Sequence, residues 1–329
     1  MKVLFIGGTG IISSASVKLG LERGLDMYLL NRGSTSTRPI PEGANVLHGD
    51  IRDPLSAQTA LEDHQFDVVV NWVAFTPEHI QTDFELFKGR TGQYVFISSA
   101  SAYQTPPASL PVTEGTVLDN PYWEYSRNKI ACEEMLVRAY REEKFPITIV
   151  RPSHTYDRTL LPFDGGYTVV NRMRHGKKVI VPGDGTSLWV LTHHTDFAKG
   201  FVPLLGLPAA IGEAVHITSD ELLTWNQIFD IVAKAAGTTA QKLHIASEAI
   251  ATFDPEWGPG LLGDKSHSMI FDNSKIKRLA PDFRASIPFA LGAEEIMAWY
   301  DADPARQKIN ETLDRTMDLL VERFDGIRP

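Results

Sequence analysis

Tyr125 and Lys129 stand four residues apart in the stretch NPYWEYSRNKIACEEM, Asn120 to Met135. On a helix this spacing places both side chains on one face. The later positions of that face are apolar and form a seam that packs on a core: Cys132, Leu136, Ala139. A lysine in such a seam costs free energy unless its charge has a partner or a task. Either both side chains reach water at a helix end, or the pair serves acid–base chemistry.

A glycine turn, GGTGIIS, lies between a strand-like segment at residues 2–6 and a helix-like segment at 10–23. Gly7 can adopt backbone angles that are closed to other residues, and Gly10 lets a pyrophosphate approach a helix N-terminus. The pattern's third glycine is replaced by Ser13, which is small enough for close packing. Its place between a strand and a helix favours a dinucleotide site.

The end of the second expected strand bears on which dinucleotide binds. An acidic residue there would bind the ribose 2′-hydroxyl of NAD, whereas an arginine suits the 2′-phosphate of NADP. Asn31 and Arg32 occupy these positions, with Ser34 and Thr35 close by. We therefore favour NADP over NAD; the alternative is that Arg32 is a solvated loop residue.

Strand-like and helix-like segments alternate over the first half of the chain. The expected strands are Lys2–Ile6, Asp26–Leu30, Asn45–His48, Phe66–Trp72, Gln93–Ser99 and Ile147–Pro152. This order predicts an α/β protein with a doubly wound parallel Rossmann sheet. After Pro152 the pattern loosens, with helices expected at Thr195–Leu205, Thr224–Ala236, Ala290–Tyr300 and Pro304–Phe324. That part predicts a smaller C-terminal α/β substrate lobe over the carboxyl ends of the strands.

Two units follow from this pattern. Residues 1–152, with about 186–205, are expected to form the NAD(P)-binding Rossmann domain. Residues 153–185 and 206–329 are expected to form the substrate-binding lobe.

The composition suits a compact globular protein of 329 residues, 43% of them hydrophobic. A net charge of −9 argues against nucleic acid or an anionic membrane as a partner. The single cysteine, Cys132, excludes an internal disulfide and fits a reducing compartment. With no apolar run near ~20 residues and no signal-peptide pattern, we expect a cytoplasmic protein.

Taken in order, the glycine turn, the Ser-Ser at 98–99 and the Tyr-x-x-x-Lys at 125–129 resemble the extended short-chain dehydrogenase/reductase family, in its NAD(P)-dependent epimerase/dehydratase branch. The likeness covers nearly the whole chain. It implies an NAD(P)-dependent oxidoreductase or epimerase that acts on a hydroxyl or keto carbon of a sugar or sugar-nucleotide-like molecule.

The resemblance also implies site residues. The catalytic group would be Ser99, Tyr125 and Lys129. Cofactor-binding residues would be Gly7, Thr9, Gly10, Ile11, Ile12, Asn31, Arg32, Asp50, Ile51, Val73, Ala74, Ser98 and Pro152. Substrate contacts would come from Ser101, His154 and Trp189.

In this scheme Tyr125 is the general acid or base, and Ser99 hydrogen-bonds the same substrate oxygen. Lys129 would hold the nicotinamide ribose and lower the pKa of Tyr125. Moving that pKa from ~10 to ~7 needs roughly 4 kcal/mol. An ammonium about 4 Å away, at an effective dielectric near 20, supplies about that much.

The sequence departs from the family pattern in three places. Ala100, Ser101 and Ala102 stand where 4,6-dehydratases need an acidic pair, which argues against that reaction. Trp189 stands where sugar-nucleotide enzymes place a diphosphate-binding arginine, a charge that Lys265 or Arg174 could replace. The segment 75–99 is shorter than in typical members and loses part of a helix used for dimers, so a monomer and a homodimer both remain open. Epimerase and reductase also remain open.

Some further residues invite functional interpretations. Adjacent residues His193 and His194 point to opposite faces of a strand, so with Asp196 they are not expected to bind a metal. Glu78 and His79 fit a helix start. Trp123 and Trp257 fit core packing or a pocket wall.

The competing class is a catalytically idle NAD(P)-binding or RNA-binding protein on the same fold. The stretch 212–229 is similar to the chloroplast stem-loop RNA-binding proteins. The presence of Ser99, Tyr125 and Lys129, together with the acidic balance, favours the enzyme.

Overall fold

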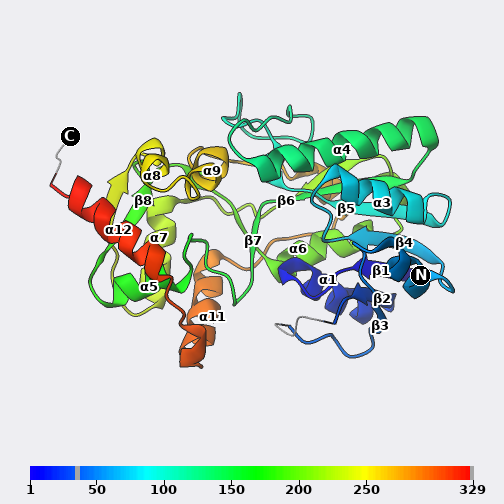
Figure 1. The fold of residues 1–329 in the computed structure, drawn as a ribbon, viewed down its shortest axis with the longest axis horizontal. Helices are drawn as coiled ribbons and strands as arrows, with labels where there is room; N and C mark the ends of the chain where they lie inside the picture. The colour runs from blue at the N-terminus through cyan, green and yellow to red at the C-terminus, as the bar shows by residue number, and fades with distance from the viewer. Residues whose placement is uncertain (34–37, 327–329) are drawn as a thin grey trace.

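The computed structural model describes residues 1–33 and 38–326. Its centre is a sheet of seven parallel strands in the order β11-β6-β5-β4-β1-β2-β3 (Figure 1). The strands are β1 (Lys2–Ile6), β2 (Asp26–Asn31), β3 (Asn45–His48), β4 (Phe66–Asn71), β5 (Thr91–Ile97), β6 (Ile147–Pro152) and β11 (Ala214–Ile217). The order reverses at β1 and β4, which confirms the predicted doubly wound Rossmann sheet.

Helices cover both faces of this sheet because its strands are apolar on both sides. In β1, for example, Val3 and Phe5 pack toward one helical layer, and Leu4 and Ile6 toward the other. The first layer holds α1 (Ile11–Glu22), α6 (His194–Phe201) and α10 (Ser274–Leu279). The second holds α2 (Pro54–Leu61), α3 (Pro77–Phe87) and α4 (Glu124–Glu143). Continuous apolar strands are typical of such covered parallel sheets.

The smaller lobe has its own hydrophobic core and three short strand pairs. The pairs are β8 (Lys178–Pro182) with β13 (Gln241–Ile245), β7 (His154–Tyr156) with β10 (Leu191–His193), and β9 (Leu188–Trp189) with β12 (Leu223–Thr224). Its helices are α5 (Tyr167–Arg174), α7 (Trp225–Ala235), α8 (Ser247–Phe253), α9 (Gly258–Gly260), α11 (Phe289–Asp301) and α12 (Glu311–Phe324). Figure 1 shows β7 running between the two units.

The chain crosses between the units more often than the expected boundaries imply. β11 and α10 fall in the range expected for the lobe, yet they complete the main sheet and one of its helical layers. Trp189 falls in the range expected for the Rossmann unit, yet it packs in the core of the lobe. Pairing partners decide these assignments: β11 finds its partner in β6, and β9 finds its partner in β12.

Two expected helices have different bounds. The helix expected at Thr195–Leu205 is α-helical only to Phe201 and continues as the 3₁₀ turn η2 (Val202–Leu204). The helix expected from Pro304 begins at Glu311, because Asn310 caps it by accepting from the Leu313 N–H at 3.0 Å. Before that cap, Pro304 belongs to the separate turn η5 (Pro304–Arg306).

Within the residues that the structure describes, no helix has the length and apolar character needed to cross a membrane.

Candidate active site

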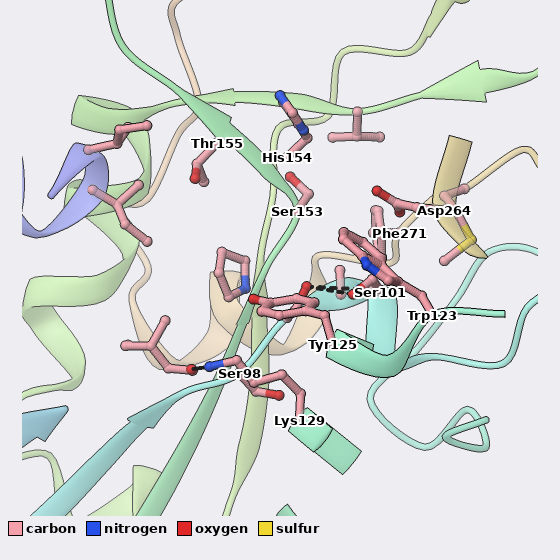
Figure 2. Close-up of a pocket in the computed structure, with 18 of the residues that line it drawn as sticks. Ser98, Ser101, Trp123, Tyr125, Lys129, Ser153, His154, Thr155, Asp264 and Phe271 are labelled. Atoms are coloured by element: carbon pink, nitrogen blue, oxygen red, sulfur yellow. Dashed lines mark hydrogen bonds between the residues drawn. The ribbon is translucent and has the colours of Figure 1, made fainter. Parts of the chain in front are cut away.

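A cavity of about 370 Å³ lies at the carboxyl ends of the sheet strands, between the sheet and the lobe. Figure 2 shows the side chains that line it. The sheet unit contributes residues after β5 and β6 and at the start of α1 and α4. The lobe contributes residues of β7 and β9 and of the π-helical turn η4 (Leu261–Lys265). Ten predicted site residues line this cavity: Ile11, Ile12, Ser98, Ser99, Ser101, Tyr125, Lys129, Pro152, His154 and Trp189.

Lys129 is buried at 2% exposure on the seam predicted from the sequence, and α4 begins just before Tyr125. The lysine amine donates to the carbonyl oxygens of Ala74 at 2.7 Å and Ile97 at 2.8 Å. Burial lowers the pKa of Lys129 to about 8. The seam lysine is therefore stabilised by backbone acceptors at the carboxyl ends of β4 and β5 rather than by a carboxylate.

Ser99 follows the end of β5 and belongs to a short chain of hydroxyl groups. Its Oγ lies 2.9 Å from Ser101 Oγ, which in turn accepts from Ser126 Oγ at 2.8 Å. Ser99 Oγ also accepts from the Ser101 N–H at 3.2 Å. These contacts fix the Ser99 hydroxyl beside the phenol of Tyr125. Ser101 is 7% exposed and serves this network as well as the cavity wall.

The pKa of Tyr125 contradicts one expectation. Burial raises it to about 12; the hydrogen bond with Ser99 lowers it in part, and the negative charge of Asp264 raises it further. Lys129 does not offset this, because its amine is turned toward the two carbonyls and lies 5.7 Å from the centre of the Tyr125 ring. The protein's own groups thus keep the phenol protonated at neutral pH.

The glycine turn has the geometry expected for a dinucleotide. Gly7 and Gly8 have φ values of +102° and +111°, and a Cβ on Gly8 would lie 2.7 Å from a methyl of Leu29. Gly10 is the N-cap of α1 and donates its N–H to Ser13 Oγ at 2.8 Å. Thr9 lies between these glycines, partly buried. The first turn of α1 reaches the cavity through Ile11 and Ile12.

Several predicted cofactor residues do not line the cavity. They lie next to the glycine turn, where strands β2, β3 and β4 end. The Arg32 side chain is 64% exposed and 4.0 Å from Asp50 Oδ2. The Asn31 amide, with its nitrogen toward the turn, donates to the Gly7 carbonyl at 2.7 Å. Ile51 and Ala74 are buried. Ser34 and Thr35 lie outside the described residues.

The segment after β4 is held by a buried polar network. Asn71 Oδ1 accepts from the Val73 N–H at 2.7 Å, and its amide donates to Asp83. Tyr94 also donates to Asp83, whose pKa burial raises to about 6. This network fixes the backbone of Val73 and Ala74 opposite the glycine turn.

These features fit a nicotinamide dinucleotide. Two left-handed glycines lead into a helix N-terminus, whose unpaired N–H groups suit a pyrophosphate. Ser98 Oγ is buried without a hydrogen-bond partner among the described residues, and Ser98 lines the cavity together with Ile11 of that helix and Lys129. The unpaired Ser98 hydroxyl could therefore donate a hydrogen bond to a ligand, or accept one from it.

The two other predicted substrate residues form an aromatic wall. Trp189 is 4% exposed, packs 5.5 Å from Trp225 and lines the cavity, so it serves the lobe core and the site together. His154 lies 6.3 Å from Trp189. Burial, with a contribution from the charge of Lys265, lowers the pKa of His154 to about 3. The wall is therefore uncharged at neutral pH.

Neither proposed substitute for the missing arginine lines the cavity. Arg174 is held at the far side of the lobe by Asp301, in a two-pronged ion pair of 2.7 and 2.8 Å. The Lys265 amine lies 3.9 Å from Asp164 and faces a neighbouring small pocket, which Trp257 also lines. Trp123, in contrast, lines the main cavity.

The remaining candidates have structural roles. His193 pairs with Glu295 at 3.1 Å, and Asp196 accepts from Lys199 at 2.6 Å. Among the described residues, no three acidic, histidine or cysteine side chains gather as metal ligands would. His79 accepts from the backbone N–H groups of Phe75 and Thr76, which places it at the start of α3.

Asp264 was not among the site residues predicted from the sequence. Its side chain lines the cavity from η4 and comes close enough to Tyr125 to raise its pKa (Figure 2). The only signal in the sequence was an acidic residue in the glycine-rich run GPGLLGD, and nothing there linked it to a helix more than a hundred residues earlier.

Comparison with known proteins gives the family and relatives of differing function. The profile of the NAD dependent epimerase/dehydratase family matches residues 3–217. The chain is 25% identical to a 2'-dehydrokanamycin reductase of Streptomyces kanamyceticus, over 86% of this chain and 80% of that one. It is also 25% identical to a chloroplast stem-loop binding protein of Arabidopsis thaliana, over 72% of this chain and 63% of that one.

A solved structure supports the fold. The UDP-glucuronic acid 4-epimerase of Bacillus cereus, with UDP-glucuronic acid and NAD, superposes with a TM-score of 0.74 at 19% identity, covering 92% of this chain and 99% of that one.

Proposed function

Because the chain belongs to the NAD-dependent epimerase/dehydratase family, we propose that it is an NAD(P)-dependent oxidoreductase. Its reaction moves a hydride between the nicotinamide and a carbon that carries a hydroxyl or keto group on a small ring compound. The observation that carries this proposal is that Ser99, Tyr125 and Lys129 meet at one cavity beside the N-terminus of α1.

The residues suit reduction of a ketone. A nicotinamide dinucleotide, when bound, would supply the hydride. Ser99 Oγ and the Tyr125 hydroxyl both hydrogen-bond the ketone oxygen and hold its carbon in place. The pKa of Tyr125, raised to about 12, keeps the phenol protonated, so it can give its proton to the oxygen as negative charge develops there. Lys129, fixed on two carbonyls, orients the ribose side of the nicotinamide.

The charges in the cavity disfavour a sugar nucleotide. Among the described lining residues Lys129 is the one lysine or arginine, and it is already bonded to the backbone. A diphosphate would therefore enter an aromatic wall without a cation to pair with it. We propose a ring compound without phosphate, in line with the 2'-dehydrokanamycin reductase among the relatives.

For the cofactor we propose NADP. The Arg32 guanidinium is exposed, and its 4.0 Å contact with Asp50 is too long to saturate it. Among the described residues nothing else pairs with it, so it is available to bind a 2′-phosphate. Equilibrium binding should show a tighter complex with NADPH than with NADH; an equal or opposite preference contradicts this assignment.

Epimerisation would use the same residues, and the relatives include a UDP-glucose 4-epimerase as well as the reductase. The nucleotide released on denaturing the purified protein separates the two reactions. Stoichiometric bound nucleotide favours an epimerase that recycles its cofactor, whereas a protein that binds NADPH reversibly favours the reductase.

Replacement of the proposed acid tests the function. Tyr125→Phe should lower the rate of ketone reduction by roughly 10²–10⁴-fold, because a phenyl ring has no proton to give. NADPH affinity should stay within about twofold. The control is Tyr122→Phe, which removes a phenol at an exposed position on the same approach to α4. Equal, measurable rates in wild type and Tyr125→Phe would overturn the role of Tyr125 as the acid, whereas a wild type that binds NADPH but reduces no ketone would favour the idle, nucleotide- or RNA-binding alternative.

A further inference from the structure

Asp264 brings a carboxylate to the wall of the cavity opposite Tyr125. It lies in η4, a π-helical turn that is held on both sides. The Asn120 amide donates to the Gly263 carbonyl at 2.7 Å and to the Ser101 carbonyl at 2.9 Å. On the other side, the Trp225 indole N–H donates to the Lys265 carbonyl at 3.0 Å. The residue between these two anchors is fixed toward the cavity (Figure 2).

A glycine makes this close approach possible. A Cβ on Gly263 would lie 2.8 Å from Trp123 Cβ and 3.0 Å from Asn120 Oδ1. Without a side chain there, η4 packs directly on the residues that precede α4. The Asp264 carboxylate is thereby brought beside Trp123, whose ring lies 5.0 Å from that of Tyr125.

The carboxylate has no partner within the described part of the protein. No hydrogen bond or ion pair reaches it, although its neighbours on the cavity wall include Trp123, Met269 and Phe271. The nearby Lys265 amine is directed to Asp164, at 3.9 Å. Burial raises the pKa of Asp264 to about 7; the positive charge of Lys265 lowers it in part, and the negative charge of Asp164 adds a smaller increase. An unpaired carboxylate on an apolar wall is costly unless a ligand supplies the opposite charge.

We propose that Asp264 is a specificity-determining residue that binds a protonated amine of the substrate. The substrate is then an amine-bearing ring compound whose ammonium group lies against Asp264 while its ketone or hydroxyl meets Ser99 and Tyr125. The aromatic rings of Trp123 and Trp189 in the cavity wall also suit an ammonium group, because aromatic faces attract cations. The inference rests on the proposed function and names its substrate class.

The test compares ligands that differ only in an amine. D-glucosamine is titrated against D-glucose, and trans-2-aminocyclohexanol against trans-1,2-cyclohexanediol, into protein saturated with NADP⁺ at pH 8, by calorimetry. The wild type should bind at least one amine about 10-fold more tightly than its hydroxyl partner. Asp264→Asn should remove that preference. In the wild type the preference should also weaken as the pH falls below 7, because the carboxylate takes up a proton.

The matched control is Asp164→Asn, which removes a nearby carboxylate that does not line the cavity. It should keep the preference for amines. A preference that survives in Asp264→Asn, or a wild type that binds the dinucleotide yet shows no preference in either pair, overturns the inference. If the wild-type protein does not bind NADPH at all, the proposed function is overturned instead. Asp264→Ser serves as a second variant if Asp264→Asn does not fold.

Discussion

At the scale of single residues, burial decides what the ionisable groups of the site can do. Lys129 and Tyr125 both have pKa values shifted toward their neutral forms, to about 8 and about 12. For Tyr125, predicted as either the acid or the base, the raised pKa favours the acid. Burial also shifts the pKa of Asp264 toward its neutral form, to about 7. The three groups line one cavity, and burial there favours the neutral form of each.

The shifted carboxyl of Asp264 predicts a pH-dependent stability. Its pKa is about 7 in the folded protein and near the usual value of 3.8 when unfolded, so the folded state binds more protons between these limits. Stability from this group is fully present below pH ~4 and is lost as the pH rises through 7. Asp264→Asn, always neutral, should match the wild type near pH 4 and exceed it above pH 7, by roughly 2–4 kcal/mol.

Thermal unfolding of both proteins across pH 4.5–8 measures this difference. The neighbouring charges on Lys265 and Asp164, and the phenol of Tyr125, are the same in both proteins and cancel in the comparison. A constant gap in melting temperature at all pH values would show that Asp264 ionises normally in the folded state.

At the scale of elements, two short segments from distant parts of the chain set the site. The N-terminus of α4 positions Tyr125 and Lys129, and η4 positions Asp264. Their contact runs through Asn120, which donates to the Gly263 carbonyl at 2.7 Å. The helix is stable by its own apolar seam, but η4 depends on contacts with its neighbours because a five-residue turn cannot stabilise itself.

Gly263→Ala should separate these two elements. Its added methyl would meet the fixed atoms of Trp123 and Asn120 at 2.8 and 3.0 Å. We expect a loss of about 1–3 kcal/mol in unfolding free energy, as for overpacked sites, together with weaker binding of amine ligands. Gly260→Ala is the control on the same segment, because its Cβ would meet only the flexible end of Lys265, at 3.6 Å. Chemical denaturation of both variants measures the difference; equal stability of the two would refute the contact.

At the scale of the whole molecule, a buried ion pair joins the sheet to the helix that carries the site. Arg151 in β6 and Glu133 in α4 are 5% and 2% exposed, and Arg151 Nε donates to Glu133 Oε1 at 2.9 Å. Arg151 also reaches the Glu114 carbonyl at 3.3 Å and lies 4.8 Å from the ring centre of Tyr103. The pair therefore connects β6, α4 and the long segment between η1 (Ala100–Ala102) and α4.

Removing one partner of this ion pair should lower the free energy of unfolding. Arg151→Met leaves the Glu133 charge buried and unpaired, and should cost about 3–5 kcal/mol of unfolding free energy. The double variant Glu133→Gln, Arg151→Met should cost less than Arg151→Met alone, since no buried charge remains. Denaturant titration gives both values. If the double variant is as unstable as the single one, packing of the Arg151 side chain rather than charge explains the loss.

The sequence by itself determined six of the seven strands of the main sheet and the glycine turn after the first of them. Apolar runs that are covered on both faces, and a glycine turn that only left-handed backbone angles satisfy, are local properties, so they could be read along the chain. The spacing of Tyr125 and Lys129 is likewise local to one helix. These elements lie where the sequence predicted them.

The tertiary structure alone decided the partners of those groups. Whether Lys129 would meet the Tyr125 phenol or two carbonyls depends on where β4 and β5 end relative to α4. The placement of β11 in the main sheet depends on its pairing with β6, more than sixty residues earlier in the chain. The placement of Asp264 in the cavity depends on packing against residues more than a hundred positions earlier. Burial and its effect on pKa arise only when such distant segments pack together, which no local pattern in the chain records.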